Sequence, residues 1–348
     1  MKNNLRKKLS FLVIGFFVFA YQFTNLAPLY ASTVAASEDS QLILGGHSIG
    51  VNINVDGIMI LGLSDFYGQD GKKYCPAKEA GLKEGDIITS VDSKVVTDAT
   101  EFSNIVDECT GGKISIEYIR NGKKISTTIV PAKCSEDGKY RLGLWARDGT
   151  TGIGTLTFAD PDTKSFGALG HGVSDADTGK LIIPGKSNIY YAAVSDVTKG
   201  TFSTPGELQG YFISSEIGSI TSNTECGIFG TLAEEVEGTR LISAASRQEV
   251  STGSATIFCC IDGNTVEEFS VNIERVNINS KDNKNMVVRI TDEKLLKSTG
   301  GIVQGMSGSP IVQNGKLVGA VTHVFVNDPT RGFGIFIENM LAEAEKNN

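Results

Sequence analysis

Proline, histidine and tryptophan are scarce in this 348-residue sequence, which has 8, 3 and 1 of them. The six cysteines form no C-x-x-C pair and have no histidine at metal-ligand spacing, so we expect no metal site and no cofactor. Spacing alone does not say which cysteines pair in disulfides. The net charge of -8 comes without clustered Lys and Arg, which excludes a broad nucleic-acid surface and leaves proteins or peptides as partners.

Glycine, in contrast, is abundant, with 40 residues spread through segments rich in Val, Ile and Thr. This pattern predicts many short strands joined by tight turns. We therefore expect a mainly β fold, and the length suggests about two domains.

The sequence has one long apolar run, residues 9–29, which follows a basic start that includes Arg6 and Lys7. A basic start and an apolar run are typical of a signal peptide, and about 20 apolar residues can also anchor a chain in a membrane. We expect residues 1–32 to be a signal peptide or membrane anchor and residues 33–41 to be a linker. The rest of the chain would then lie outside the cytoplasm.

Residues 42–133 have the pattern of a small α+β domain. The segment 78–88 predicts a one-turn helix, a tight turn and a strand; 97–109 suits a helix; and Asn121-Gly122 predicts a two-residue hairpin turn. This order resembles a PDZ domain of the circularly permuted bacterial kind. In a PDZ domain a glycine-rich loop binds the carboxylate of a peptide that adds to a sheet edge. We expect this peptide-binding loop at Gly46, Ser48, Ile49 and Gly50.

Residues 134–348 predict strand after strand, without a helical period before residues 339–346. Near the end, residues 305–310 (G-M-S-G-S-P) precede a hairpin whose turn is Asn314-Gly315. G-x-S-G-x-P followed by a hairpin is the nucleophile frame of chymotrypsin-like peptidases. It predicts a double β-barrel with Ser307 as nucleophile and the amides of Gly305 and Ser307 as the oxyanion hole.

A serine nucleophile needs a neighbouring base, and three histidines leave little choice. His171 lies between glycines at a predicted strand end and precedes the serine, as in the chymotrypsin order. His323, one hairpin after the serine, is the alternative base. Spacing does not choose the acid that orients the base, and the candidates are Asp175, Asp177, Asp196, Asp262 and Asp292.

Four segments together resemble the stage IV sporulation protein B (SpoIVB) peptidase family. They are residues 167–171, 227–232, 299–310 and 319–329. The resemblance extends from about residue 44 to the C-terminus. It implies that the catalytic serine, histidine and aspartate are Ser307, His171 and Asp292.

The resemblance also implies a role. Such a peptidase acts in the space between the forespore and mother-cell membranes, cleaves itself near its N-terminus, and cleaves a membrane-bound sporulation regulator, which leads to sigma-factor activation. The PDZ module would recognise the chain itself and its substrate. A non-catalytic PDZ adaptor with a degenerate peptidase domain is the alternative.

Overall fold

The computed structural model describes residues 41–233, 236 and 240–347, all within the compact unit Ala36–Asn348. The predicted signal peptide or anchor at 1–32, and the linker up to residue 40, lie outside the described residues. None of the helices found in the described ranges is both long and apolar enough to cross a membrane.

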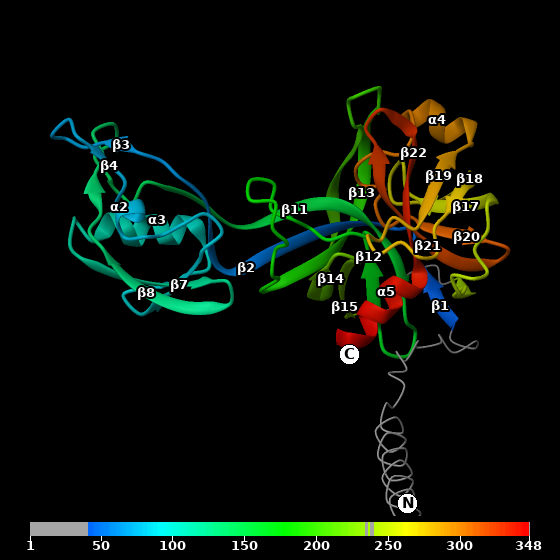
Figure 1. Cartoon of the computed structure of the whole chain (residues 1–348), viewed down its shortest axis with the longest axis horizontal. Helices are drawn as coiled ribbons and strands as arrows, with labels where there is room; N and C mark the ends of the chain where they lie inside the picture. The colour runs from blue at the N-terminus through cyan, green and yellow to red at the C-terminus, as the bar shows by residue number, and fades with distance from the viewer. Residues whose placement is uncertain (1–40, 234–235, 237–239, 348) are drawn as a thin grey trace, which may run out of the picture. The chain divides into compact units, whose positions relative to one another are not determined.

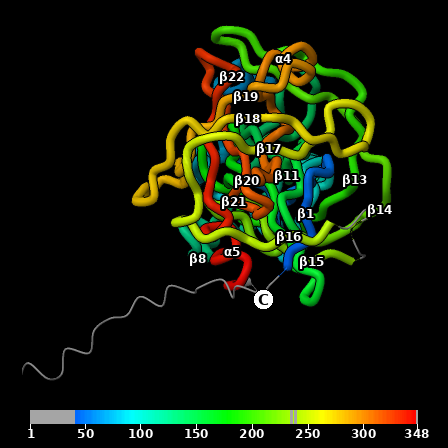
Figure 2. The backbone as a smooth tube through the Cα atoms, turned by 90° about the vertical axis from the view of Figure 1, so that its right-hand side faces the viewer, coloured from blue at the N-terminus to red at the C-terminus, as the bar shows by residue number. Residues whose placement is uncertain are grey.

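The fold is mainly β, as the sequence predicts, and six of its strands close a first barrel (Figure 1). The pairing of β2 with β11 completes the ring, and β1 (Gln41–Leu44) and β16 (Leu241–Ser243) extend the same sheet beside β11 (Figure 2). In ring order the barrel strands are β2 (Ser48–Leu63), β11 (Leu144–Ala159), β12 (Ser165–Ala168), β15 (Gly227–Leu232), β14 (Glu207–Thr224) and β13 (Ser187–Thr198).

A second closed barrel follows in the chain. Its strands are antiparallel, and the Asn314-Gly315 turn joins two of them in the predicted hairpin, with both turn residues at positive φ as a type I′ turn requires. The strands are β17 (Gly253–Cys259), β18 (Glu267–Val276), β19 (Met286–Ile290), β22 (Asp328–Phe336), β21 (Lys316–Phe325) and β20 (Pro310–Gln313).

The two barrels share an apolar interface. Leu44 of the adjoining β1, and Phe158 and Phe229 of the first barrel, cluster with Phe258 and Ile335 of the second, and all five side chains are buried. Each barrel also has a core of its own. Loops that meet at this interface are therefore held by two packed bodies.

A small α+β domain is inserted into the first barrel. We call residues 58–146 the insert; they have a separate apolar core. The predicted helix is α3 (Ala99–Glu108), and the predicted hairpin is β7 (Ile114–Arg120) with β8 (Lys123–Ile129). The other elements are β3 (Phe66–Tyr67), β4 (Lys73–Tyr74), α2 (Pro76–Glu79), β5 (Ile87–Val91), β6 (Lys94–Val95), β9 (Ala132–Lys133) and β10 (Tyr140–Arg141).

The insertion corrects the predicted domain boundaries at 42 and 133. Residues 48–54 pair with β11 or β13 as barrel strands, whereas residues 58–59 of the same β2 pair with β5 of the insert. The chain returns through β11, which pairs with both halves of β2. The insert thus interrupts the first barrel instead of preceding it.

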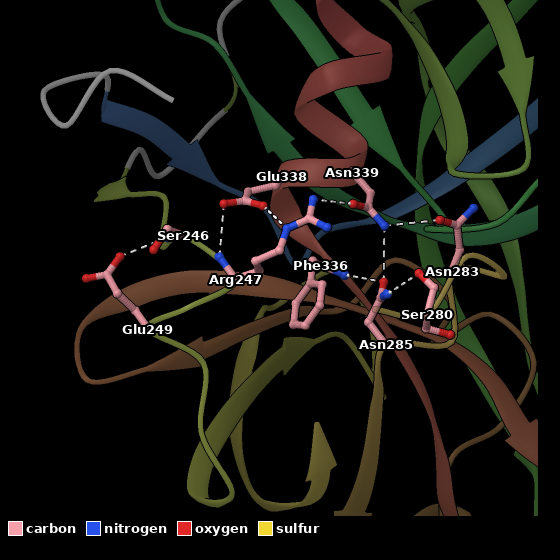
Figure 3. A network of polar contacts seen from close by, with 9 residues as sticks. All are labelled: Ser246, Arg247, Glu249, Ser280, Asn283, Asn285, Phe336, Glu338 and Asn339. Atoms are coloured by element: carbon pink, nitrogen blue, oxygen red, sulfur yellow. Dashed lines mark hydrogen bonds and ion pairs between the residues drawn. The ribbon is translucent and has the colours of Figure 1, made fainter. Parts of the chain in front are cut away.

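Two helices accompany the second barrel. The sequence predicts the C-terminal one, α5 (Ile337–Ala344), which the short helix η1 (Glu345–Asn347) follows. It does not predict α4 (Glu293–Thr299), whose two turns are too short for a clear period. Figure 3 shows how polar contacts hold the start of α5: Arg247 binds the Glu338 carboxylate and the Asn339 side chain.

Candidate active site

Ser307 lies in a tight loop between α4 and β20, beside a pocket of about 460 Å³. Its hydroxyl donates to the carbonyl of Thr322 on β21 at 2.7 Å. His171, His323 and Gly305 line the same pocket, so the structure brings the predicted nucleophile, base, alternative base and oxyanion residue together. No Asp, Glu, Lys or Arg is among the described residues that line it.

The backbone of this loop is bonded in a way that favours an oxyanion hole. The carbonyls of Gln304 and Met306 accept from the amides of Leu208, at 2.9 Å, and Ser309, at 3.0 Å. The amides on the same two peptide units, those of Gly305 and Ser307, donate to no protein acceptor in the part of the chain that the structure describes. Because a trans peptide points its N–H away from its carbonyl, fixing the two carbonyls orients the two free donors.

His171 follows β12 after a turn in which Leu169 and Gly170 both have positive φ. Its Nδ1 lies 2.9 Å from the carbonyl oxygen of Gly172, which accepts a hydrogen bond and so selects the tautomer with a proton on Nδ1. Burial lowers the pKa of His171, against a smaller opposing effect of the Gly172 carbonyl. The ring is therefore neutral at pH 7, with a lone pair on Nε2, which is the form a general base needs.

His323 is the second imidazole of the pocket. Its ring centroid lies 4.7 Å from that of His171, and burial, followed by the neighbouring His171, lowers its pKa to about 4. It adjoins Thr322, whose carbonyl holds the Ser307 hydroxyl. His323 therefore lies next to the reacting groups as a neutral ring.

The structure places the candidate acids outside the pocket lining. Asp292 is the N-cap of α4, and its carboxylate accepts the amide of Leu295 at 3.0 Å. Asp175 and Asp177 pair with Arg147. Asp196 accepts the amide of Val197 at 2.8 Å, and Asp262 is exposed. In this structure the Gly172 carbonyl takes the place at Nδ1 that an acid would occupy.

The predicted peptide-binding loop is wrong in its location. Residues 46–50 lie in the peptidase part, where Ser48 and Ile49 pair with β11 and are buried at 2% and 0% exposure. A Cβ on Gly46 would press against Phe258, a residue of the second barrel. These residues are packing positions between strands, and a peptide cannot reach them.

The groove of the insert lies elsewhere, in a pocket of about 660 Å³ between α3 and the chain that enters β11. One wall is Ala99, Phe102 and Ser103 of α3, and the other is the segment 140–146. The start of β11 pairs with β2 along one edge, through Leu144 with Leu63. The signal that could have located this wall is Arg-Leu-Gly-Leu at 141–144, a glycine between leucines directly before a strand.

All six cysteines are free thiols in the structure. Burial raises the pKa of Cys226 to about 11, so this thiol is protonated and a poor ligand at neutral pH. Among residues 41–233, 236 and 240–347, no group of three or more His, Cys, Asp or Glu side chains is arranged to hold a metal ion.

The SpoIVB peptidase S55 family matches residues 138–341, more than half of the chain. The chain belongs to this family. The family is one of peptidases, and a PDZ domain matches residues 70–120, within the insert.

Relatives outside the SpoIVB family match only in part. The zinc metalloprotease RasP of Geobacillus kaustophilus is 27% identical over 209 residues, 51% of this chain and 48% of that protein. The matched part of the chain thus spans less than half of the length of each of four curated relatives. The described residues do not fit a zinc site.

Two solved structures are similar at low identity. The active form of the Rv3671c protease of Mycobacterium tuberculosis is 14% identical, with a TM-score of 0.36 over 57% of this chain and 74% of that one. The PDZ domain of the SdrC-like protein of Listeria monocytogenes is 22% identical, with a TM-score of 0.22 over 26% of this chain and 87% of that one.

Proposed function

We propose that the chain is a regulatory serine endopeptidase of sporulation with a chymotrypsin-like mechanism. The observation that carries this proposal is one pocket that holds Ser307, His171 and two amides without an acceptor. Two barrels with the base on the first and the nucleophile on the second also match the chymotrypsin arrangement.

In the proposed mechanism the Ser307 hydroxyl leaves Thr322 and donates to Nε2 of His171. Hydroxyl rotation is a small step, and catalytic hydrogen bonds are often not formed before substrate binds. His171 takes the proton as Ser307 attacks the scissile carbonyl, and the amides of Gly305 and Ser307 bind the oxyanion. The imidazolium then protonates the leaving amine, and water repeats the cycle on the acyl-enzyme.

The pocket also suggests the kind of bond that is cleaved. Ile302, Val303, Val324 and Val326 contribute apolar walls, and the lining has no charged side chain among the described residues. An apolar side chain is therefore the best fit next to the scissile bond, because a charged one would lose its hydration without finding a partner.

The physiological role rests on family membership. We propose that the chain acts outside the cytoplasmic membrane, in the space between forespore and mother cell. It would cleave its own N-terminal region and a membrane-bound sporulation regulator, which leads to sigma-factor activation. A groove that takes extended peptides would help to select both substrates.

The test of the nucleophile and base uses the full chain in membranes, with self-cleavage and labelling by a fluorophosphonate as readouts. We expect Ser307→Ala to abolish both, and His171→Ala to slow labelling by about 10³-fold or more. His323→Ala, a matched change one ring away, should label within tenfold of the native chain. Labelling of the Ser307→Ala chain at the native rate would overturn the proposal.

Asp292 stays a proposed orienting acid, and its cap position allows a clean test. Asparagine caps a helix about as well as aspartate, whereas alanine costs about 1 kcal/mol of stability. If Asp292 orients His171, Asp292→Asn should slow labelling by as much as about 10⁴-fold while the protein stays stable. If Asp292 is only a cap, Asp292→Asn should label normally and Asp292→Ala should lower only the melting temperature.

The adaptor alternative is favoured by one observation, the Ser307 hydroxyl bound to Thr322 instead of His171. An adaptor would bind peptide in the groove of the insert with Ser307 unreactive. Fluorophosphonate labelling that fails in the folded native chain, together with intact peptide binding, would support this alternative.

A further inference from the structure

Strand β11 of the first barrel contacts the nucleophile loop of the second barrel through two buried threonines. Thr155 and Thr157 are both 0% exposed and, two residues apart, point to the same face of the strand. The Thr155 hydroxyl donates to the carbonyl of Gly305 at 2.9 Å, and the Thr157 hydroxyl donates to that of Gly308 at 2.7 Å. The Thr155 amide also donates to the carbonyl of Ser307, at 3.0 Å.

With these bonds, each backbone carbonyl of residues 304–308 accepts a hydrogen bond. The loop itself and Leu208 supply donors for the carbonyls of Met306 and Gln304. Strand β11 supplies all of the donors for the other three, at 305, 307 and 308. Every carbonyl from 304 to 308 thus has a donor, and the free groups are the amides of Gly305 and Ser307.

The close approach of the two segments shows that the loop fits β11 tightly. Gly308 has a φ of +94°, and a Cβ there would overlap the carbonyl oxygen of Thr155. A buried hydroxyl is unfavourable in an apolar core unless it is hydrogen-bonded, and valine has nearly the same shape. Packing alone would therefore be served by valine at both positions, whereas the bonds to the loop require the hydroxyls.

We propose that Thr155 and Thr157 are positioning residues that hold the peptide units around Ser307 so that the oxyanion donors stay aligned. The proposal rests on Ser307 being the nucleophile. The Thr155 hydroxyl holds the carbonyl of Gly305, on the peptide unit between the two units that carry the free amides. The Thr155 amide holds the carbonyl of Ser307, and the Thr157 hydroxyl holds that of Gly308, on the two peptide units that follow Ser307. Neither touches substrate, so their effect passes through the loop.

The experiment measures fluorophosphonate labelling of the full chain over a range of probe concentrations. Because the loss of alignment affects the bound complex, Thr155→Val should lower the limiting labelling rate by about 10- to 100-fold while the half-saturating concentration stays within about twofold. Thr157→Val should show a smaller effect in the same direction. Thr155→Ser keeps the hydroxyl and should label within about threefold of the native chain.

Thr127→Val is the control. Thr127 lies on β8 of the insert, is partly buried, and donates its hydroxyl to a backbone carbonyl, that of Ala80, at 3.2 Å. We expect this change to lower the melting temperature and leave the limiting labelling rate unchanged. A similar loss in Thr127→Val would reduce the threonine effect to general destabilisation and overturn the proposal.

The outcomes separate this proposal from the assignment of Ser307. If Ser307→Ala is not labelled and folded Thr155→Val is labelled at the native rate, the positioning role is refuted and the assignment of Ser307 as nucleophile is kept. If Ser307→Ala still labels, the nucleophile assignment fails first. Should Thr155→Val not fold, Thr155→Ser and Thr157→Val decide, because a purely structural role predicts equal limiting rates in both.

Discussion

The groove of the insert and the pocket at Ser307 are built by opposite means. The groove borders the start of a strand, so main-chain groups are available to pair with an extended peptide. At Ser307 the loop carbonyls already have donors, and two amides are left over. Under the proposed roles, the site that recognises a peptide leaves a strand edge open, whereas the catalytic site leaves only the two oxyanion donors free. Strand β11 contributes to both.

The largest test of this contrast asks whether the insert and the barrels are separate folding units. Asp86 is 1% exposed and is held by Arg120 at 2.6 Å. Arg120→Met leaves this carboxylate buried without its partner, which should destabilise the insert by about 3–5 kcal/mol. Chemical denaturation should then show an early transition, with Ser307 labelled normally before the second transition.

The matched control for this change is the double variant Asp86→Asn with Arg120→Met, which removes the charge together with its partner and should recover part of the stability. Loss of labelling in step with the early transition would contradict separate units and show that the insert supports the barrels.

A smaller effect is expected from filling the groove. Ser103 is exposed on α3 and lines the groove, so Ser103→Trp should weaken binding of a fluorescent peptide with an apolar, free C-terminus by about tenfold. Asn104→Trp, the next position, lies outside the lining and should bind normally. Fluorescence anisotropy measures both. Equal affinities would place the peptide site elsewhere on the insert.

The smallest effect concerns pH. Because burial lowers the pKa of His171 from 6.5, the neutral base persists below that value, and labelling should fall with an acid limb centred below pH 6.5. The unfolded chain binds this proton first, so the free energy of unfolding should also decrease as the pH drops below about 6.5. NMR titration of the His171 ring in the Ser307→Ala chain measures the pKa directly. A midpoint above 6.5 would contradict the burial argument.

The sequence predicts short local motifs of this chain better than it predicts which strands pair with one another. Ser307, Gly305 and His171 line one pocket in the structure, and residue type over a short span is enough to select them: the G-M-S-G-S-P frame for the first two and the scarcity of histidine for the third. The boundary at residue 42 is wrong because β2 is one unbroken strand of 16 residues whose two halves have different partners. The pairing of β2 with β11 joins residues more than 80 positions apart, and no short sequence pattern predicts such a contact.

The role of Thr155 is missed for the same reason. A threonine in a strand is ordinary, and only the approach of a loop 150 positions later gives its hydroxyl a use. Asp292 illustrates the reverse case, because its position before Glu293 and an apolar pair is also a helix-cap signal. One residue can satisfy two patterns, and the sequence does not rank them.

The insertion also determines how the chain can be cut. Two passages, in β2 and in β11, join the insert to the first barrel, and both passages are barrel strands. A single cleavage before residue 41 leaves the insert attached to the first barrel. Release of the insert requires two further cuts, one in β2 and one in β11, and both would open the barrel. If the N-terminal region is cleaved as proposed, the insert therefore stays attached to the first barrel, because its removal would cut two barrel strands.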